Sequence, residues 1–380
     1  MGGGGRAERG AAYAAAAWVA GCVGCAAAAL WLARRRGRRR WDRTARRAEC
    51  VVDLIGGTPL LRIDSLSKLT GCDIYGKAEF LNPGGSIKDR VALGIVREAL
   101  ADGRLPPGGT VFEGTAGSTG VSLAMVASAL GCRCHVVMPD DAAIEKCEML
   151  HAYGAEVERV RPVSIAHPDH FVNVARRRAS HAEGGFFSDQ FENPANFRAH
   201  LATGEEIWEQ TGGRIDAFIA AAGTGGTIAG VAASLKARSP RTRIVLVDPP
   251  GSSLYNRVKR GVLFSPVEQE GKRLKNPFDT ITEGIGINRL TSNFKKGEAC
   301  IDDAVRGTDE EAVRMARWLT CRDGLFVGSS SAMNCVGALK VHPHAHTHTN
   351  THTDTDTHTH THTHTHTDTH THTRTHAHSS

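Results

Sequence analysis

The chain has 380 residues, of which 41% are hydrophobic, as expected for a globular protein with one large or two medium domains. Its net charge of +6 is local, because residues 1–49 contain eleven Arg and three acidic residues, whereas residues 50–340 carry no net charge. A neutral body argues against nucleic acid as a partner. The ten cysteines are scattered, so we expect no disulfide framework and no metal site.

The first 49 residues have the pattern of a membrane anchor. Residues 11–33 carry no charge and are long enough to span a bilayer, which takes about 20 residues. Nine Arg follow within residues 34–47, and positive charge keeps that side of a span in the cytosol. We therefore predict a transmembrane segment at 11–33 with the body in the cytosol. A mitochondrial presequence is the alternative, since Arg is abundant and acidic residues are few.

Between residues 50 and 340, short apolar runs alternate with segments of helical periodicity. This alternation predicts an α/β fold, in which mostly parallel sheets have helices on both faces. Strands are expected at 51–54, 74–79, 110–113, 134–138, 156–160, 186–187, 216–221, 244–247 and 325–327. Helices are expected after Lys88 and at 121–130, 142–152, 171–179, 197–210, 228–236 and 313–319.

Residues 82–90, NPGGSIKDR, are the stretch that most directly indicates a function. The proline and glycines predict a turn, Ser86 is the expected N-cap, and Lys88 then lies in the first turn of a helix. The helix dipole disfavours a cation there and lowers the amine pKa, which a Schiff-base lysine needs. Taken alone, the stretch also fits a solvated surface lysine.

Glycine-rich loops fall between predicted strands and helices, where backbone N–H groups and the helix dipole bind anions. The loop at 223–227, GTGGT, is the best phosphate cradle, and its spacing fits neither the dinucleotide fingerprint nor a P-loop. A second loop covers 114–120. Together with a lysine at a helix start, such loops suit pyridoxal phosphate, with one loop for its phosphate and another for a substrate carboxylate.

Residues 50–340 resemble the cysteine synthase/cystathionine β-synthase family of fold-type II pyridoxal-phosphate enzymes, most of all a membrane-anchored, mitochondrial cysteine synthase-like branch. The matching segments stand in family order at 57–60, 82–90, 115–120, 190–196, 223–227 and 328–331. The resemblance implies two three-layer α/β/α domains with mostly parallel sheets, the tryptophan synthase β-like fold, and the cofactor in the cleft between them.

The resemblance also implies the domain boundaries. The small domain is expected at about 84–190, and the large domain at about 50–83 plus 191–340. The large domain is expected to be incomplete at its C-terminus, because the family continues with a further strand and helix. Here residues 341–380 are a repeat of His and Thr that holds 14 of the 20 histidines and is expected to be disordered. We favour a translated dinucleotide repeat over a metal-binding tail as its origin.

Residue roles carry over from the resemblance position by position. Lys88 is implied as the Schiff-base lysine and the base at Cα, and Ser330 as the partner of the pyridine nitrogen. Further implied cofactor contacts are Ser118, Gly223, Thr224, Gly225, Gly226 and Thr227. Implied contacts to the substrate carboxylate are Thr115, Ala116, Gly117, Ser118, Thr119 and Gln190. Ser118 departs from most of the family, which has Asn there.

The implied reaction is a β-replacement, in which O-acetylserine and sulfide give L-cysteine and acetate through a Lys88 aldimine and an aminoacrylate. A serine hydroxyl at the ring nitrogen leaves the pyridine unprotonated, which favours loss of the β substituent. The alternatives are another pyridoxal-phosphate reaction (serine dehydratase, cysteine desulfhydrase or cystathionine β-synthase) and an inactive membrane-tethered relative. The resemblance further implies a homodimer in the mitochondrial outer membrane, with the catalytic region facing the cytosol.

Overall fold

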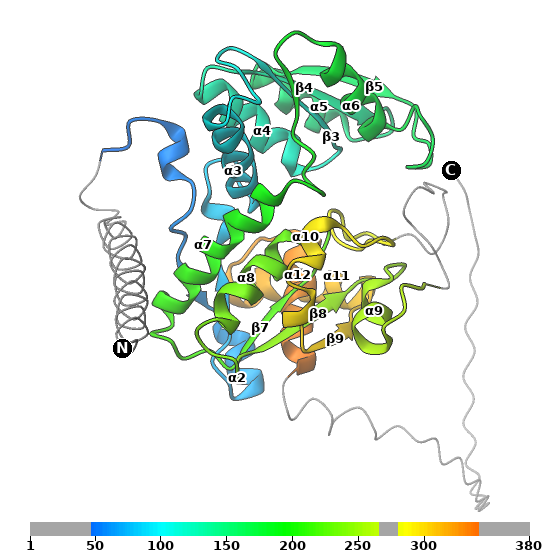
Figure 1. The fold of residues 1–380 in the computed structure, drawn as a ribbon. Coiled ribbons are helices and arrows are strands. Elements are labelled where there is room, and N and C mark those ends of the chain that lie inside the picture. Colours follow the sequence, from blue (N-terminus) through cyan, green and yellow to red (C-terminus); the bar gives the residue numbers. More distant parts are fainter. Residues whose placement is uncertain (1–46, 266–279, 342–380) are drawn as a thin grey trace, which may run out of the picture.

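The computed structural model describes residues 47–265 and 280–341 (Figure 1). The predicted anchor at 11–33 lies outside the described residues, as does the His/Thr repeat beyond Val341. The described chain contains two parallel sheets and one small antiparallel pair. The prediction of an α/β fold with mostly parallel sheets is confirmed.

The first parallel sheet has the strand order β5-β4-β3-β6. Its core residues alternate along the strands. Val136 packs with the helices on one face, and its neighbour Val137 packs with α6 on the other. Both are fully buried, as expected for a parallel sheet covered on both faces. The strands are β3 (Thr110–Gly114), β4 (Arg133–Pro139), β5 (Glu156–Val160) and β6 (Gly185–Phe187). The helices are α3 (Lys88–Ala101), α4 (Ser118–Ala129) and α5 (Ile144–Ala152) on one face and α6 (Phe171–His181) on the other.

The second parallel sheet has the order β7-β8-β9 and is covered in the same way. On β8, Leu246 packs against α8, whereas Val247 packs against α12. The strands are β7 (Ala217–Ala220), β8 (Arg243–Asp248) and β9 (Asp303–Arg306). One face carries α8 (Gly226–Lys236), α9 (Leu254–Arg260), α10 (Ser292–Lys295) and η3 (Glu298–Cys300), and the other carries α11 (Asp309–Asp323) and α12 (Ser329–Val341).

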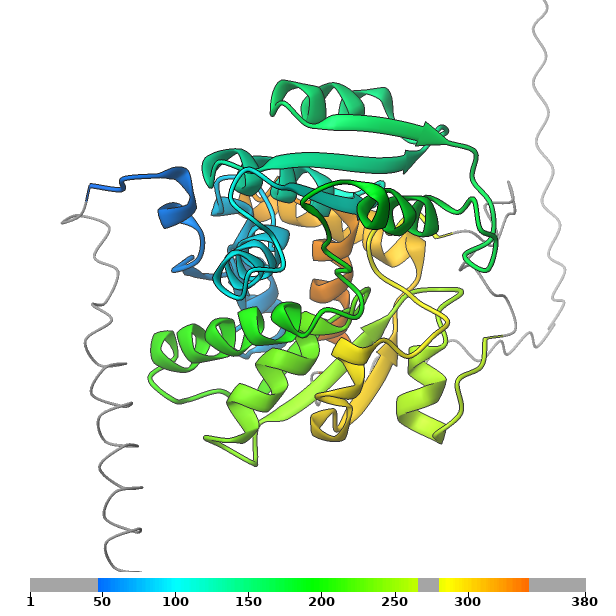
Figure 2. The same cartoon turned by 45° about the horizontal axis from the view of Figure 1, so that its top comes forward.

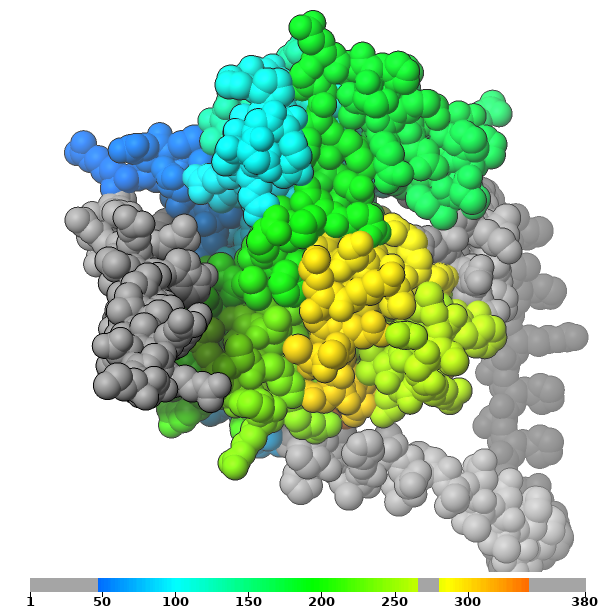
Figure 3. All heavy atoms as spheres, viewed as in Figure 1, coloured from blue at the N-terminus to red at the C-terminus, as the bar shows by residue number. Residues whose placement is uncertain are grey.

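Helix α7 (Pro194–Gln210) joins the two halves of the molecule, because it packs against α3 on one side and α8 on the other. The two ribbon views agree that it lies between the sheets (Figures 1 and 2). In the space-filling view the two halves are in contact, with the green segment that contains α7 crossing between them (Figure 3).

The segment before the first large sheet contains η1 (Val51–Leu54), β1 (Leu60–Arg62), α2 (Asp64–Thr70), β2 (Tyr75–Lys77) and η2 (Glu79–Leu81). Strands β1 and β2 pair antiparallel, with Leu60 opposite Lys77. Leu66 of α2 is fully buried against α11 and α12.

Two predicted strands are wrong. Residues 51–54 form the 3₁₀ helix η1, because the Asp53 carboxylate accepts the N–H of Cys50 at 3.1 Å and closes a turn. Residues 325–327 connect α11 to α12, and Phe326 is 94% exposed. In both cases the apolar run has only three or four residues, and the periodicity of so short a run does not separate a strand from other structure.

The predicted localisation also needs correction. None of the helices in residues 47–265 and 280–341 is long and apolar enough to cross a membrane. The longest, α7, has 17 residues and carries charged side chains, whereas a span needs about 20 apolar residues. The prediction of an outer-membrane protein whose catalytic region faces the cytosol is therefore corrected, since no described helix supplies its anchor.

Candidate active site

Lys88 is the first residue of α3 and follows a tight glycine turn. The N–H of Gly85, which has φ 79°, donates to Asn82 O at 2.8 Å. The buried carboxylate of Asp89 accepts the N–H of Gly84 at 2.6 Å and the hydroxyl of Ser122 on α4 at 2.5 Å. A Cβ at Gly84 would lie 2.4 Å from Asp89 Oδ1, so only glycine fits. The turn before the lysine is thus fixed against α4.

The environment of Lys88 suits a reactive amine. Its side chain is partly buried, and desolvation lowers the pKa of the amine, as the sequence predicted. The cause is burial of the amine, and not the helix dipole that the sequence suggests. Among the described residues, Lys88 Nζ has no hydrogen bond or ion pair. Ser86 Oγ accepts the Lys88 N–H at 3.2 Å, although the N-cap position itself is Ile87.

The loop at 223–227 connects β7 to α8, and its glycines are tightly packed. Gly225 has φ 80° and is the N-cap of α8, so the N-cap has no side chain, and the Gly226 N–H makes only a long hydrogen bond of 3.4 Å to Thr224 Oγ1. A Cβ at Gly223 would lie 2.2 Å from Gly284 O, and one at Gly226 would lie 2.0 Å from Asn196 Oδ1. Apart from the Gly226 N–H, the first backbone amides of this helix are therefore available to an anion, at a position that larger residues would distort.

Neighbouring side chains hold this loop on both flanks. The hydroxyl of Thr224 accepts a hydrogen bond from Asn196 Nδ2 at 2.9 Å, and its carbonyl accepts one from Thr291 Oγ1 at 2.7 Å. Asn196 Nδ2 also donates to Gln190 O at 2.8 Å. The loop at 223–227 is in this way tied to the segment that contains Gln190.

His200 connects the loop to the surroundings of the lysine. It is fully buried on α7, and its Nε2 lies 3.1 Å from the hydroxyl of Thr227. Burial, with the positive charges of Arg90 and Lys88, lowers the pKa of His200 to about 3. The imidazole is therefore neutral at pH 7. The positive charge of Lys88 is close enough to contribute to this lowered pKa. No motif in the sequence indicated this histidine.

The loop at 115–119 connects β3 to α4 and lies beside Gln190. Thr119 Oγ1 donates to Gln190 Oε1 at 2.7 Å, and both residues are buried although they are 71 positions apart. Gly117 is the N-cap of α4 and provides no capping side chain. Ala116 is partly exposed, and Gly117 and Ser118 are exposed at the surface of this loop. Thr115 is buried, and its N–H donates to Val137 O at 2.9 Å.

Ser330 lies in the first turn of α12. One turn further along, Asn334 Oδ1 accepts the N–H of Ala221 at 2.8 Å, directly before the loop at 223–227. Residues four apart share a helix face, so Ser330 is on the same side as Asn334. The N-terminal end of α12 therefore lies near the loop at 223–227, which His200 and Asn196 also contact.

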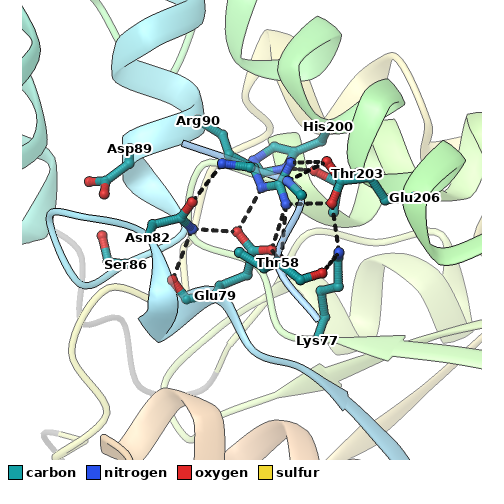
Figure 4. Close-up of polar contacts among 12 residues, drawn as sticks. Thr58, Lys77, Glu79, Asn82, Ser86, Asp89, Arg90, His200, Thr203 and Glu206 are labelled. Atoms are coloured by element: carbon teal, nitrogen blue, oxygen red, sulfur yellow. Dashed lines mark hydrogen bonds and ion pairs between the residues drawn. The ribbon is translucent and has the colours of Figure 1, made fainter. Parts of the chain in front are cut away.

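A buried ionic network surrounds Arg90, two residues after Lys88 on α3 (Figure 4). Arg90, with its side chain 6% exposed, donates to Glu79 Oε2 at 2.7 Å and to both carboxylate oxygens of Glu206 at 2.7 Å. Lys77 Nζ reaches Glu206 at 2.6 Å and Thr58 O at 2.6 Å. The network holds α3, which begins with Lys88, to α7 and to the segment from β2 to η2. The sequence analysis did not foresee it.

Comparisons with known proteins show which proteins the chain is similar to. A sequence model of the family described as "Pyridoxal-phosphate dependent enzyme" matches residues 51–350. "Cysteine synthase 2" of Neurospora crassa is 57% identical over 304 residues, which cover 77% of this chain and 67% of that protein. A Saccharomyces cerevisiae protein named "Putative mitochondrial cysteine synthase" is 51% identical over 303 residues, 77% of each chain. Its name specifies no membrane anchor.

A solved structure also resembles the fold. The crystal structure of O-ureido-L-serine synthase superposes with a TM-score of 0.67 at 32% sequence identity, covering 77% of this chain and 86% of that one.

The residues present fit the cofactor that the family description names. A Cβ at Gly223, Gly225 or Gly226 would clash with a neighbouring segment, and the start of α8 offers helix N-terminal amides to a phosphate. The unpaired, desolvated amine of Lys88 suits an aldehyde. His200 contacts Thr227 of the loop at 223–227, and the charge of Lys88 helps to lower the pKa of His200. This loop and the amine are therefore both near His200.

Proposed function

Because this chain belongs to the pyridoxal-phosphate dependent enzyme family and is a homologue of cysteine synthases, we propose that it converts O-acetylserine and sulfide to L-cysteine and acetate. When bound, pyridoxal phosphate supplies an aldehyde that joins amino groups and a ring that withdraws electrons from Cα. The observation that carries the proposal is the desolvated amine of Lys88, which has no partner among the described residues and whose charge helps lower the pKa of His200, the residue that contacts Thr227 of the loop at 223–227.

Lys88 is the proposed attachment point of the cofactor and the proposed base. A lysine with a lowered pKa has a larger neutral fraction at pH 7, and its free Nζ accepts the proton from the substrate Cα. The neutral form is also the nucleophile that joins an aldehyde. The turn that Asp89 fixes would hold the Lys88 backbone in place while the side chain moves between these two tasks.

The two loops have separate proposed roles. Gly223, Thr224, Gly225, Gly226 and Thr227 hold the cofactor phosphate with backbone amides and hydroxyls. Thr115, Ala116, Gly117, Ser118 and Thr119, with Gln190, hold the substrate carboxylate. Ser118 also approaches the cofactor, and Ser330 supplies a neutral hydroxyl to the ring nitrogen. A neutral partner would leave that nitrogen unprotonated, so that the bound ring would withdraw electrons less strongly.

The test uses purified protein reconstituted with pyridoxal phosphate. We expect a visible absorption band from the covalently bound cofactor and cysteine formation from O-acetylserine and sulfide. Lys88→Ala should lose the band and more than about a thousandfold of the turnover, since it removes both attachment and base. Lys68→Ala is the matched control, because Lys68 is an exposed lysine on α2. Normal turnover by Lys88→Ala, or no reaction of the wild type, would refute the proposal.

Product identity separates this reaction from its relatives. Cysteine from O-acetylserine and sulfide supports the synthase. Formation of cystathionine when homocysteine replaces sulfide would instead favour cystathionine synthesis, and pyruvate released from serine or cysteine would favour a dehydratase or desulfhydrase.

We also propose two domains, at about 84–190 and at 50–83 with 191–340, and assembly as a homodimer. Large apolar side chains are exposed along a single segment from η1 to η2, which a second copy would cover. The exposed residues are Leu54, Leu61, Leu69, Tyr75, Phe80 and Leu81. Light scattering should give twice the chain mass, and Leu69→Glu with Phe80→Glu should lower it. A monomeric wild type would contradict the assembly.

A further inference from the structure

Glu113 is a buried carboxyl group at the end of β3, directly before the loop at 115–119. It is 1% exposed. Gln190 Nε2 donates to Glu113 Oε1 at 3.2 Å, and the Gln190 backbone N–H approaches Oε2 at 3.4 Å. The hydroxyl of Ser188 also donates to Oε2. The two N–H groups of Gln190 can only donate, and the Ser188 hydroxyl can donate as well, so the set fits an ionised carboxylate, which can only accept.

This contact decides which way the Gln190 amide faces. Gln190 Oε1 accepts the hydroxyl of Thr119 at 2.7 Å. A hydroxyl can donate or accept, so Thr119 alone would tolerate either orientation of the amide. The carboxylate of Glu113 tolerates only one, with the NH₂ group toward it. The second N–H of that NH₂ group has no partner among the described residues and remains available to a ligand.

The backbone around Gln190 is fixed by other contacts. Asp189 has φ 49° and is the one residue other than glycine with positive φ in the described part of the chain. It lies between Ser188 and Gln190, both of which bond Glu113. The carbonyl of Gln190 accepts Asn196 Nδ2 at 2.8 Å and Asn293 Nδ2 at 3.0 Å. The backbone therefore keeps its position when Glu113 changes, and the side-chain amide is the part that Glu113 controls.

We propose that Glu113 is a positioning residue for substrate recognition: it orients the Gln190 amide so that an N–H, and not the carbonyl oxygen, faces the carboxylate of the amino-acid substrate. This inference rests on the proposed role of Gln190 in binding that carboxylate. An N–H attracts a carboxylate, whereas a reversed amide would turn its oxygen toward the same negative charge. Glu113 thus acts through Gln190 without touching the substrate.

The main test is Glu113→Gln, which preserves shape and allows the Gln190 amide to reverse. Burial raises the pKa of Glu113 to about 7, so assays at about pH 8 keep the wild-type carboxyl ionised. We expect the KM for O-acetylserine to rise about tenfold or more, with kcat changed less than about threefold, because the lost contact binds substrate and transition state alike. Glu113→Asp, which retains a carboxylate, should restore part of the affinity.

Two controls separate positioning from a structural effect. Ser188→Ala removes another donor to Glu113 but leaves the bond to Gln190, so its KM should stay within about twofold of the wild type. In a Gln190→Ala background, Glu113→Gln should add less than about a twofold change, since the residue through which it acts is gone. The affinity of the apoprotein for pyridoxal phosphate should stay within about twofold in every variant, which excludes general damage to the site.

Several outcomes would overturn the inference. They are an unchanged KM in folded Glu113→Gln, an equal rise in Ser188→Ala, or the same rise in the Gln190→Ala background. If Glu113→Gln does not fold, Glu113→Asp and Gln190→Ala decide the question through the same KM comparison. If the wild type does not consume O-acetylserine, the proposed function fails separately. L-Serine binding, followed by the cofactor spectrum, then tests Glu113: an unchanged affinity in Glu113→Gln refutes the inference.

Discussion

Replacing Arg90 with methionine should destabilise the protein strongly, because it leaves two carboxylates without the cation that they share. The guanidinium donates to Glu79 and Glu206 over distances of 2.7 to 2.9 Å and is 6% exposed. Methionine fills a similar length of side chain but offers no donor. Among the described residues, Glu206 would then keep Lys77 as its cation, and Glu79 would keep only neutral hydrogen-bond donors, Thr58 and Asn82.

Two routes give the same size of effect. Removing one member of a buried ion pair costs about 3–5 kcal/mol. Independently, the partners of Glu206, Arg90 foremost, overcome the effect of burial and lower its pKa to about 2, against 4.5 for the free side chain. That difference corresponds to about 3 kcal/mol. Since its pKa is lower in the folded state, Glu206 stabilises the protein above about pH 4.5, and this contribution is lost as the pH falls toward 2.

Urea unfolding followed by circular dichroism at pH 7 and at pH 3 measures both effects. Arg90→Met should lower the unfolding midpoint at pH 7 by the equivalent of about 3 kcal/mol or more. It should also lose less further stability at pH 3 than the wild type does. Arg198→Met is the matched control, because Arg198 pairs with Glu98 at the exposed surface of α7 and should cost less than about 1 kcal/mol. Equal midpoints for the two variants would refute the reasoning.

Two further predictions concern the cofactor cradle and the buried histidine. Gly226→Ala should weaken pyridoxal-phosphate binding to the apoprotein at least about tenfold, because its Cβ would lie 2.0 Å from Asn196 Oδ1. Gly94→Ala, where the nearest atom is 3.4 Å away, is the control, and equal dissociation constants in a titration would contradict the prediction. The pKa of His200 falls from 6.5 in the unfolded chain to about 3, so its stabilising contribution is present above pH 6.5 and lost as the pH falls toward 3. His200→Gln should flatten the fall in stability between about pH 6 and 4, and parallel curves for variant and wild type would rule this out.

The sequence was most informative where local chemistry determines local structure. Residues 156–160 form a strand with the predicted bounds, and Lys88 lies in the first turn of α3 as predicted, although the N-cap is Ile87 and not Ser86. Glycine loops between strands and helices are visible in sequence because a tight turn at a helix start needs glycine. By contrast, β9 was missed because Asp303–Arg306 offers only two apolar residues, and its place is set by pairing with β8. The apolar triplet at 325–327 misled for the opposite reason, since it has strand composition without a partner strand.

The contacts that arrange the site were beyond a reading of the sequence because they join residues far apart in the chain. His200 meets Thr227, Gln190 meets Thr119, and Arg90 meets Glu206, with separations of 27 to 116 positions. In none of these pairs does the sequence spacing indicate which residue the partner is. Each contact also lies on α7 or directly before it, so the helix that packs on both halves of the molecule carries most of this hidden arrangement.

The position of α7 gives these contacts a common consequence. Glu206, on one face of the helix, pairs with Arg90 in the buried ionic network. His200, on another face, contacts the hydroxyl of Thr227. The segment before the helix carries Gln190, which Glu113 and Thr119 hold. A shift of α7 would therefore move the supports of Lys88, of the loop at 223–227 and of the loop at 115–119 together. Substitution of Glu206 should for this reason lower the affinity for both cofactor and substrate, whereas substitution of Glu113 should lower the affinity for substrate alone.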